Sequence, residues 1–317
     1  MCDPDHTPYT GLTPDCVLDA VDATGLRSNG RLLALNSYEN RVYQIGLEDG
    51  DFVVAKFYRP GRWSDATIAE EHEFSQQLAD AELPVVAPLR LDGRSLLQHA
   101  GFRYALYPRR GGRAPELESD DHLAWMGRLL GRMHGIGARH PFRHRPGFDR
   151  EAMIEAPARA ALASGLIPGH LQTPYRDAVA RLDAAVAERF AAAGPQRTLR
   201  LHGDCHPGNI LWTDAGPHFV DLDDARNGPA MQDLWMLAQD AHGLDALLEG
   251  YAQFADLEPG ALALIPALRA MRLAHHGGWI AQRWRDPAFP AAFPYAAQAR
   301  WWQEHIDDLG EATAAMT

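Results

Sequence analysis

Residues 201–212 read Leu201-His202-Gly203-Asp204-Cys205-His206-Pro207-Gly208-Asn209-Ile210-Leu211-Trp212. The apolar end of this run predicts a β-strand, and His218-Phe219-Val220 predicts a second one. Between them, Thr213 to Pro217 contains the Asp, Gly and Pro residues that favour a tight reversal. We therefore expect a β-hairpin with Asn209 just before its first strand and Asp221 just after its second, at the same open end.

Oxygen-bearing side chains surround this hairpin in the pattern that phosphoryl transfer requires. The transition state of that reaction spreads negative charge over three equatorial oxygens, and metal ions stabilise it. Mg²⁺ prefers oxygen ligands and keeps several waters, so we predict Asn209 and Asp221 as ligands and Asp223 as the ligand of a second ion. Asp204 has the spacing from Asn209 that protein kinases use, in which the Asp accepts the proton of the acceptor hydroxyl. Asp233 is expected to anchor the backbone of this loop.

These residues allow two other interpretations. His202, Cys205 and His206 allow a zinc site, but no second ligand pair follows at the usual spacing. The acidic run Asp221 to Asp224 is compatible with a solvated turn, but it directly follows a strand that looks buried. Both patterns therefore favour the phosphoryl-transfer interpretation.

The first third of the chain predicts a sheet, with strands at Arg31–Leu35, Arg41–Leu47 and Phe52–Tyr58. In the third strand Lys56 shares a face with apolar side chains, which costs free energy unless an anion meets the ammonium group. A nucleotide phosphate would do so, as with the strand lysine of kinases. The alternative is an edge-strand lysine that limits aggregation.

Further elements complete this predicted domain. A helix is expected from Ser64 to Ala81, and a five-stranded antiparallel sheet is expected in this domain. Three more strand-like segments follow, one more than that sheet needs: Pro84–Leu91, Arg94–Gln98 and Gly101–Tyr107. The turn Asn36–Asn40 contains no glycine, so phosphate contacts there would come from backbone N–H groups and the hydroxyl of Ser37. Backbone groups of Leu106–Pro108, around Tyr107, are placed to bind the adenine edge.

Helical periodicity begins at Ser119, and its first apolar stripe indicates core packing. Further helices are expected at Pro174–Ala193, Asp233–Gly243, Ala261–Arg285 and Pro294–Ala315. The four tryptophans of the last two segments fit core packing better than an aromatic acceptor pocket. We therefore predict an α+β, bilobal, kinase-like fold, with a sheet-rich lobe over residues 1–107, a linker at 108–113 and a mainly helical lobe over 108–317.

Composition excludes several classes of partner. The 317-residue chain carries a net charge of −12 without a large Lys/Arg cluster, so a nucleic-acid partner is not expected. Its three cysteines have no disulfide spacing, and neither a signal peptide nor an apolar run of membrane-spanning length occurs. We expect a cytoplasmic monomer. The acidic balance suits a cationic substrate, although it also serves solubility alone.

The motif Leu-His-Gly-Asp-x-His-x-Gly-Asn, followed by a hairpin and Asp-x-Asp, resembles the aminoglycoside phosphotransferase and choline kinase superfamily. The residues at 35–43, 56–63 and 201–237 are similar to one branch of it, protein kinases of the bacterial stress response. This resemblance implies ATP and Mg²⁺ as cofactors and a Ser/Thr acceptor on a protein substrate. It also implies an ion pair of Lys56 with Glu71, with Glu70 as the alternative.

The residues themselves leave two other functions open. The segment Asp221–Asp233 is too short for the long activation loop on which protein kinases bind peptides, which favours a small-molecule hydroxyl kinase with a choline-, homoserine- or aminoglycoside-like acceptor. A nucleotide-binding pseudokinase is the third hypothesis. It is weakened by the presence of Lys56, Asp204 and Asn209 as well as Asp221.

Overall fold

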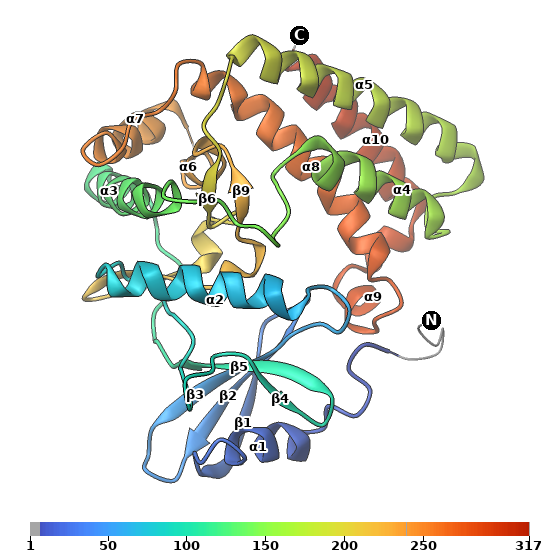
Figure 1. Cartoon of the computed structure of the whole chain (residues 1–317). Helices are drawn as coiled ribbons and strands as arrows, with labels where there is room; N and C mark the ends of the chain where they lie inside the picture. Colours follow the sequence, from blue (N-terminus) through green and yellow to red (C-terminus); the bar gives the residue numbers. More distant parts are fainter. Residues whose placement is uncertain (1–6, 239, 317) are drawn as a thin grey trace. The chain divides into compact units, whose positions relative to one another are not determined.

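The computed structural model describes residues 7–238 and 240–316 (Figure 1). The chain forms two compact units. The first unit contains the residues up to Glu116, Arg143–Arg145 and His206–Ala225, and the second contains Leu117–Phe142, Pro146–Cys205 and the residues from Arg226 onward. The sequence had assigned 206–225 to the helical domain. The structure groups this segment with the sheet because Phe219 bonds Pro84 and Val86 through backbone groups at 2.7 and 3.0 Å.

The first unit is built on a five-stranded antiparallel sheet in the order β1-β2-β3-β5-β4. Its elements are α1 (Pro14–Asp22), β1 (Ser28–Leu35), β2 (Arg41–Leu47), β3 (Phe52–Phe57), α2 (Asp65–Asp80), β4 (Leu97–His99) and β5 (Phe102–Pro108). The two helices are capped at their N-termini: the side chains of Thr13 and Ser64 accept the backbone N–H of Cys16 and Thr67.

One predicted strand of this sheet is wrong. Pro84–Leu91 is not a strand, and the five other predicted strand segments correspond to the five strands of the sheet. Pro84 and Pro88 have no N–H to donate to a ladder, and the segment instead makes isolated backbone bonds, among them Leu89 N–H to Leu106 O at 2.7 Å. It therefore connects α2 to the sheet as an extended segment.

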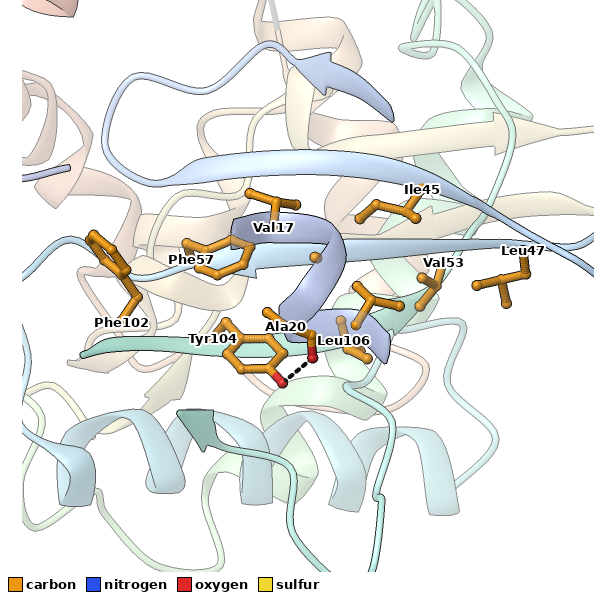
Figure 2. Close-up of a cluster of buried hydrophobic side chains, with 11 residues drawn as sticks. Val17, Ala20, Ile45, Leu47, Val53, Phe57, Phe102, Tyr104 and Leu106 are labelled. Atoms are coloured by element: carbon orange, nitrogen blue, oxygen red, sulfur yellow. Dashed lines mark hydrogen bonds between the residues drawn. The ribbon is translucent and has the colours of Figure 1, made fainter. Parts of the chain in front are cut away.

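Successive side chains of each strand point to opposite faces of the sheet, and the two faces pack against different helices. Val53, Ala55 and Phe57 of β3 pack with α1 in a core that also takes side chains from β2 and β5 (Figure 2). Within this core the hydroxyl of Tyr104 donates to the carbonyl of Ala20 at 2.6 Å. On the opposite face a smaller cluster contains Ile68 of α2. The intervening residues of β3 therefore face α2 rather than α1.

The hairpin of the first unit has the predicted form. β7 (Ile210–Thr213) pairs antiparallel with β8 (Gly216–Phe219), and short 3₁₀ turns precede and follow the hairpin at Pro207–Asn209 and Leu222–Asp224. Asn209 and Asp221 flank the hairpin at one end, where Val220 N–H donates to Asn209 O at 3.0 Å.

The second unit is mainly helical. Its elements are α3 (Asp120–Gly137), a π-helical turn (Glu151–Glu155), α4 (Ala156–Ala163), α5 (Gly169–Ala193), β6 (Leu199–Leu201), β9 (Arg226–Gly228), α6 (Met231–Leu234), α7 (Ala241–Tyr251), a 3₁₀ turn (Ala261–Leu264), α8 (Ile265–Gln282), α9 (Ala288–Ala292), a second 3₁₀ turn (Pro294–Ala297) and α10 (Ala299–Ala314). β6 pairs antiparallel with β9. Within residues 7–238 and 240–316, no helix combines the length and the apolar character that crossing a membrane requires.

Two helix predictions in this unit need correction. The predicted helix Asp233–Gly243 does not form, because α6 ends at Leu234 and α7 starts anew at Ala241 after the capping side chain of Asp240. α5 begins at Gly169, five residues before the predicted Pro174. The apolar stripe of α3 is buried as predicted, and Trp302 is fully buried in the core.

Helices α3 and α7 lie side by side (Figure 1), and they approach most closely at two glycines. A Cβ atom on Gly127 of α3 would overlap the carbonyl oxygen of Leu247, and a Cβ atom on Gly250 of α7 would overlap that of Ala124. Beyond this contact His134 of α3 and the hydroxyl of Tyr251 of α7 are hydrogen-bonded at 3.0 Å. The two backbones can approach this closely only because neither glycine carries a side chain.

Candidate active site

The first unit contains a cavity of about 300 Å³ between the α2 face of the sheet and the hairpin. Six of the predicted site residues line it: Ser37, Lys56, Glu71, Tyr107, Asn209 and Asp221. Apolar side chains such as Val54 and Leu211 form much of the remaining wall. A cavity with apolar walls and a few convergent polar groups is typical of a small-molecule site.

Lys56 is buried in this cavity, with 6% of its surface exposed. Its Nζ lies 2.7 Å from Asp221 Oδ1 and 3.4 Å from Asp223 Oδ1. Burial disfavours the charged ammonium, but these two carboxylates and Glu71 outweigh it and raise the pKa of Lys56 well above its ordinary value. Lys56 is therefore a cation at neutral pH, as an anion-binding role requires.

Glu71 lies in the same cavity, but the structure pairs Lys56 with Asp221 and Asp223 instead. Its side chain is buried, and Oε2 has no hydrogen-bond partner. Burial raises the pKa of this carboxyl from 4.5 to about 7, against the opposing effect of Lys56. The alternative partner, Glu70, is engaged elsewhere: its carboxylate accepts the backbone N–H groups of 143–145 at 2.7 to 3.2 Å.

Asp221 has an unusual backbone conformation for a residue with a side chain. Its φ is +59°, in the left-handed region that costs a non-glycine residue roughly 1 kcal/mol. Its side chain is 50% exposed, and one carboxylate oxygen bonds Lys56. Together with Asn209, it supplies the oxygen donors that Mg²⁺ prefers, so the residues present fit such an ion.

Asp223, the predicted ligand of a second metal ion, is buried among protein partners. This carboxylate is 3% exposed, and its Oδ2 accepts hydrogen bonds from Asn40 Nδ2 at 3.1 Å and from Arg62 Nη1. Burial would raise its pKa, but Arg62 and Lys56 lower it to about 2. Oδ2 of Asp223 is thus occupied by protein donors, whereas among the described residues Oδ1 makes only the ion pair with Lys56 at 3.4 Å. Sequence patterns missed Arg62, which lies 161 residues from its partner.

Asp204 belongs to the second unit, and its loop is held as predicted. The carboxylate of Asp233 is fully buried and accepts the backbone N–H of His202 at 2.8 Å and of Gly203 at 2.9 Å. His134 Nε2 lies 3.1 Å from the same carboxylate. The anchoring role of Asp233 is therefore confirmed.

The side chain of Asp204 has a partner that no motif indicated. Its Oδ1 lies 2.5 Å from Nη1 of Arg272, in the middle of α8. The carboxylate is 22% exposed and the guanidinium 41% exposed. Arg272 carries no local sequence signal, because only the packing of α8 brings it to Asp204.

Comparisons with known proteins identify the family of the chain. The sequence profile described as "Phosphotransferase enzyme family" matches residues 31–272. The chain is 44% identical over 310 residues to "Stress response kinase A" of Salmonella choleraesuis (strain SC-B67), covering 96% of this chain and 94% of that protein. It is 43% identical over 310 residues to "Serine/threonine protein kinase RdoA" of Salmonella typhimurium (strain LT2), with the same coverage.

A solved structure supports the fold. The structure described as "Amicoumacin kinase hAmiN in complex with AMP-PNP, Ca2+ and Ami" is similar with a TM-score of 0.70 at 21% sequence identity, and the match covers 93% of each chain. At this identity the likeness concerns the fold alone. The predicted kinase-like α+β fold is confirmed.

Proposed function

The chain belongs to the phosphotransferase enzyme family, and from that premise we propose that it is an ATP- and Mg²⁺-dependent serine/threonine protein kinase. The observation that carries this proposal is the cavity in which a buried lysine, Lys56, meets the two oxygen donors Asn209 and Asp221. These are the groups that phosphoryl transfer needs for positioning and for charge stabilisation.

Within the proposal each residue of the cavity has one task. Lys56 binds phosphate oxygens of ATP, and Asn209 and Asp221 hold Mg²⁺, which when bound neutralises charge on the phosphate groups. The hydroxyl of Ser37 and the backbone N–H groups of its turn bind phosphate, and the backbone beside Tyr107 binds adenine. Glu71 would be the carboxylate that pairs with Lys56 if Asp221 held the metal ion.

Asp204 is proposed as the residue that accepts the proton of the acceptor hydroxyl. Its support is the spacing to Asn209 and the rigidity of its loop, whose backbone N–H groups are fixed by Asp233. Arg272 keeps the Asp204 side chain in one orientation through the contact at 2.5 Å. An oriented carboxylate transfers a proton more efficiently than a mobile one.

The substrate class rests on the relatives. The name of the Salmonella typhimurium relative specifies a serine/threonine protein kinase, and the match extends over 96% of this chain. One observation favours the second candidate, a small-molecule hydroxyl kinase: the residues between Asp221 and Asp233 form a 3₁₀ turn, β9 and the start of α6, without a long loop for a peptide.

Incubation of the pure protein with γ-labelled ATP and Mg²⁺ distinguishes these candidates. Label on the protein itself or on a generic basic protein supports the protein kinase. Label only on an added alcohol, such as choline, homoserine or an aminoglycoside, supports the small-molecule kinase. Tight ATP binding without any transfer would refute both and indicate a pseudokinase.

A further inference from the structure

The turn Asn36–Asn40 borders the cavity and contains no glycine, yet it is held in one conformation by side chains from other parts of the first unit. Arg59 donates from Nε to the carbonyl of Glu39 at 3.1 Å and from Nη2 to that of Tyr38 at 3.3 Å. The hydroxyl of Tyr9 donates to the same Glu39 carbonyl at 2.9 Å. The carbonyl groups of Tyr38 and Glu39 are thus both satisfied by side-chain donors.

Asn40 connects this turn to the segment that follows the hairpin. Its side-chain oxygen accepts the backbone N–H of Arg59 at 3.1 Å, and its Nδ2 donates to Asp223 Oδ2 at 3.1 Å. Asn40 is 2% exposed and Asp223 is 3% exposed. A buried hydrogen bond to a carboxylate is worth more than a neutral one, because water does not compete for either partner.

Arg62 makes the same connection by charge. It bonds Asp223 through Nη1 and Asp224 through Nη2, the latter at 2.8 Å, and its Nε lies 3.7 Å from the Glu39 carboxylate. The ring of Trp63 lies 4.7 Å from the guanidinium carbon. One guanidinium therefore contacts both the turn and the segment with Asp221, in the planar geometry that lysine cannot reproduce.

We propose that Asp223 is a positioning residue, which through Asn40 and Arg62 fixes the turn Asn36–Asn40 to the segment carrying Asp221. This inference rests on the proposed ATP site. It assigns the phosphate-binding side of that site a preformed turn in place of a flexible glycine-rich loop. Because the turn is already ordered, little conformational entropy is lost there when a nucleotide binds.

Swapping the amide and the carboxylate between positions 40 and 223 tests the proposal. Asn40→Asp places a carboxylate against Asp223, and the repulsion should separate the turn from the segment. Amide hydrogen exchange in residues 36–40 should accelerate, and Kd for TNP-ATP with Mg²⁺ should rise about tenfold, the effect of losing one charge-assisted bond. The double variant Asn40→Asp/Asp223→Asn restores one donor and one acceptor, and should recover most of the lost affinity and protection.

Asp223→Asn alone separates a positioning role from a metal-ligand role. We expect the Mg²⁺ concentration required for TNP-ATP binding to stay within about twofold of the wild type. An Mg²⁺ requirement raised as strongly as in Asp221→Asn would overturn the proposal. Additive losses in the double variant, or unchanged exchange at 36–40 in Asn40→Asp, would also overturn it.

Two further variants guard against trivial outcomes. Asn29→Asp is the matched control, since Asn29 Nδ2 donates to Leu47 O at 2.8 Å and Asn29 does not line the cavity. In this variant, the amide hydrogen exchange of residues 36–40 and the affinity for TNP-ATP should equal those of the wild type. Asn40→Ala removes the bond without adding charge, so it serves if Asn40→Asp does not fold. Faster exchange at 36–40 is expected there too, and unchanged exchange would refute the proposal. Amide hydrogen exchange is measured without nucleotide, so it tests this inference even if the protein does not bind ATP.

Discussion

Replacing Glu71 by glutamine should remove a pH dependence from the stability of the protein. Burial raises the pKa of Glu71 from 4.5 to about 7 in the folded state. The folded protein then binds this proton more tightly than the unfolded chain does. The free energy of unfolding therefore falls as pH rises from about 4.5 to about 7.

The magnitude follows from the pKa change. At 1.36 kcal/mol for each pKa unit, the rise from 4.5 to about 7 corresponds to about 3 kcal/mol. Glu71→Gln is neutral at every pH and lacks this contribution. Compared with the wild type, the variant should be nearly unchanged at pH 5 and more stable by up to about 3 kcal/mol at pH 8.

Urea unfolding of the nucleotide-free protein between pH 5 and 8 measures this difference. Glu73→Gln is the matched control, because Glu73 lies on the exposed side of the same helix and bonds only Gln77. The Glu73 variant should follow the wild-type profile. If the Glu71→Gln profile also ran parallel to the wild type, the buried carboxyl would not titrate in this range and the reasoning would be refuted.

Three other substitutions test the candidate site. Asp204→Asn should remove most phosphoryl transfer and keep ATP binding, whereas Asp221→Asn should weaken Mg²⁺-dependent ATP binding; if both variants behaved alike in both assays, the roles would be wrong. Asp233→Asn leaves a buried backbone N–H without an acceptor and should lower the free energy of unfolding by about 2–4 kcal/mol in urea titrations; a loss under about 1 kcal/mol would contradict the anchoring role. Arg272→Gln releases the Asp204 carboxylate and should lower kcat in steady-state assays while leaving KM for ATP unchanged; an unchanged kcat would argue against the orienting role.

Features with a local cause could be predicted from the sequence. The hairpin at 210–219 follows from turn residues between two short apolar runs, and the starts of α1 and α2 follow from Thr13 and Ser64 as capping residues. Lys56 could be placed on the cavity face because side chains alternate along a strand. In each case the cause lies within a few residues of the effect.

Features with a distant cause could not be predicted in this way. Pro84–Leu91 has the composition of a strand, but its backbone bonds go to single residues far along the chain, such as Phe219. The partners of Asp223 and Asp204, which are Arg62 and Arg272, are 161 and 68 residues away from them. The start of α7 at Ala241 has a local cause, because Asp240 is a capping residue directly before it. The apolar periodicity across this position nevertheless favoured one continuous helix.

The glycine contact between α3 and α7 has a consequence for inherited variation. His134 of α3 joins Tyr251 of α7 to the carboxylate of Asp233, so the spacing of the two helices also sets the place of the loop before Asp204. A single added methyl group at Gly127 or Gly250 would push the helices apart and tilt that histidine. Natural variants with a substitution at Gly127 or Gly250 should therefore lose activity, although neither residue carries a reactive side chain.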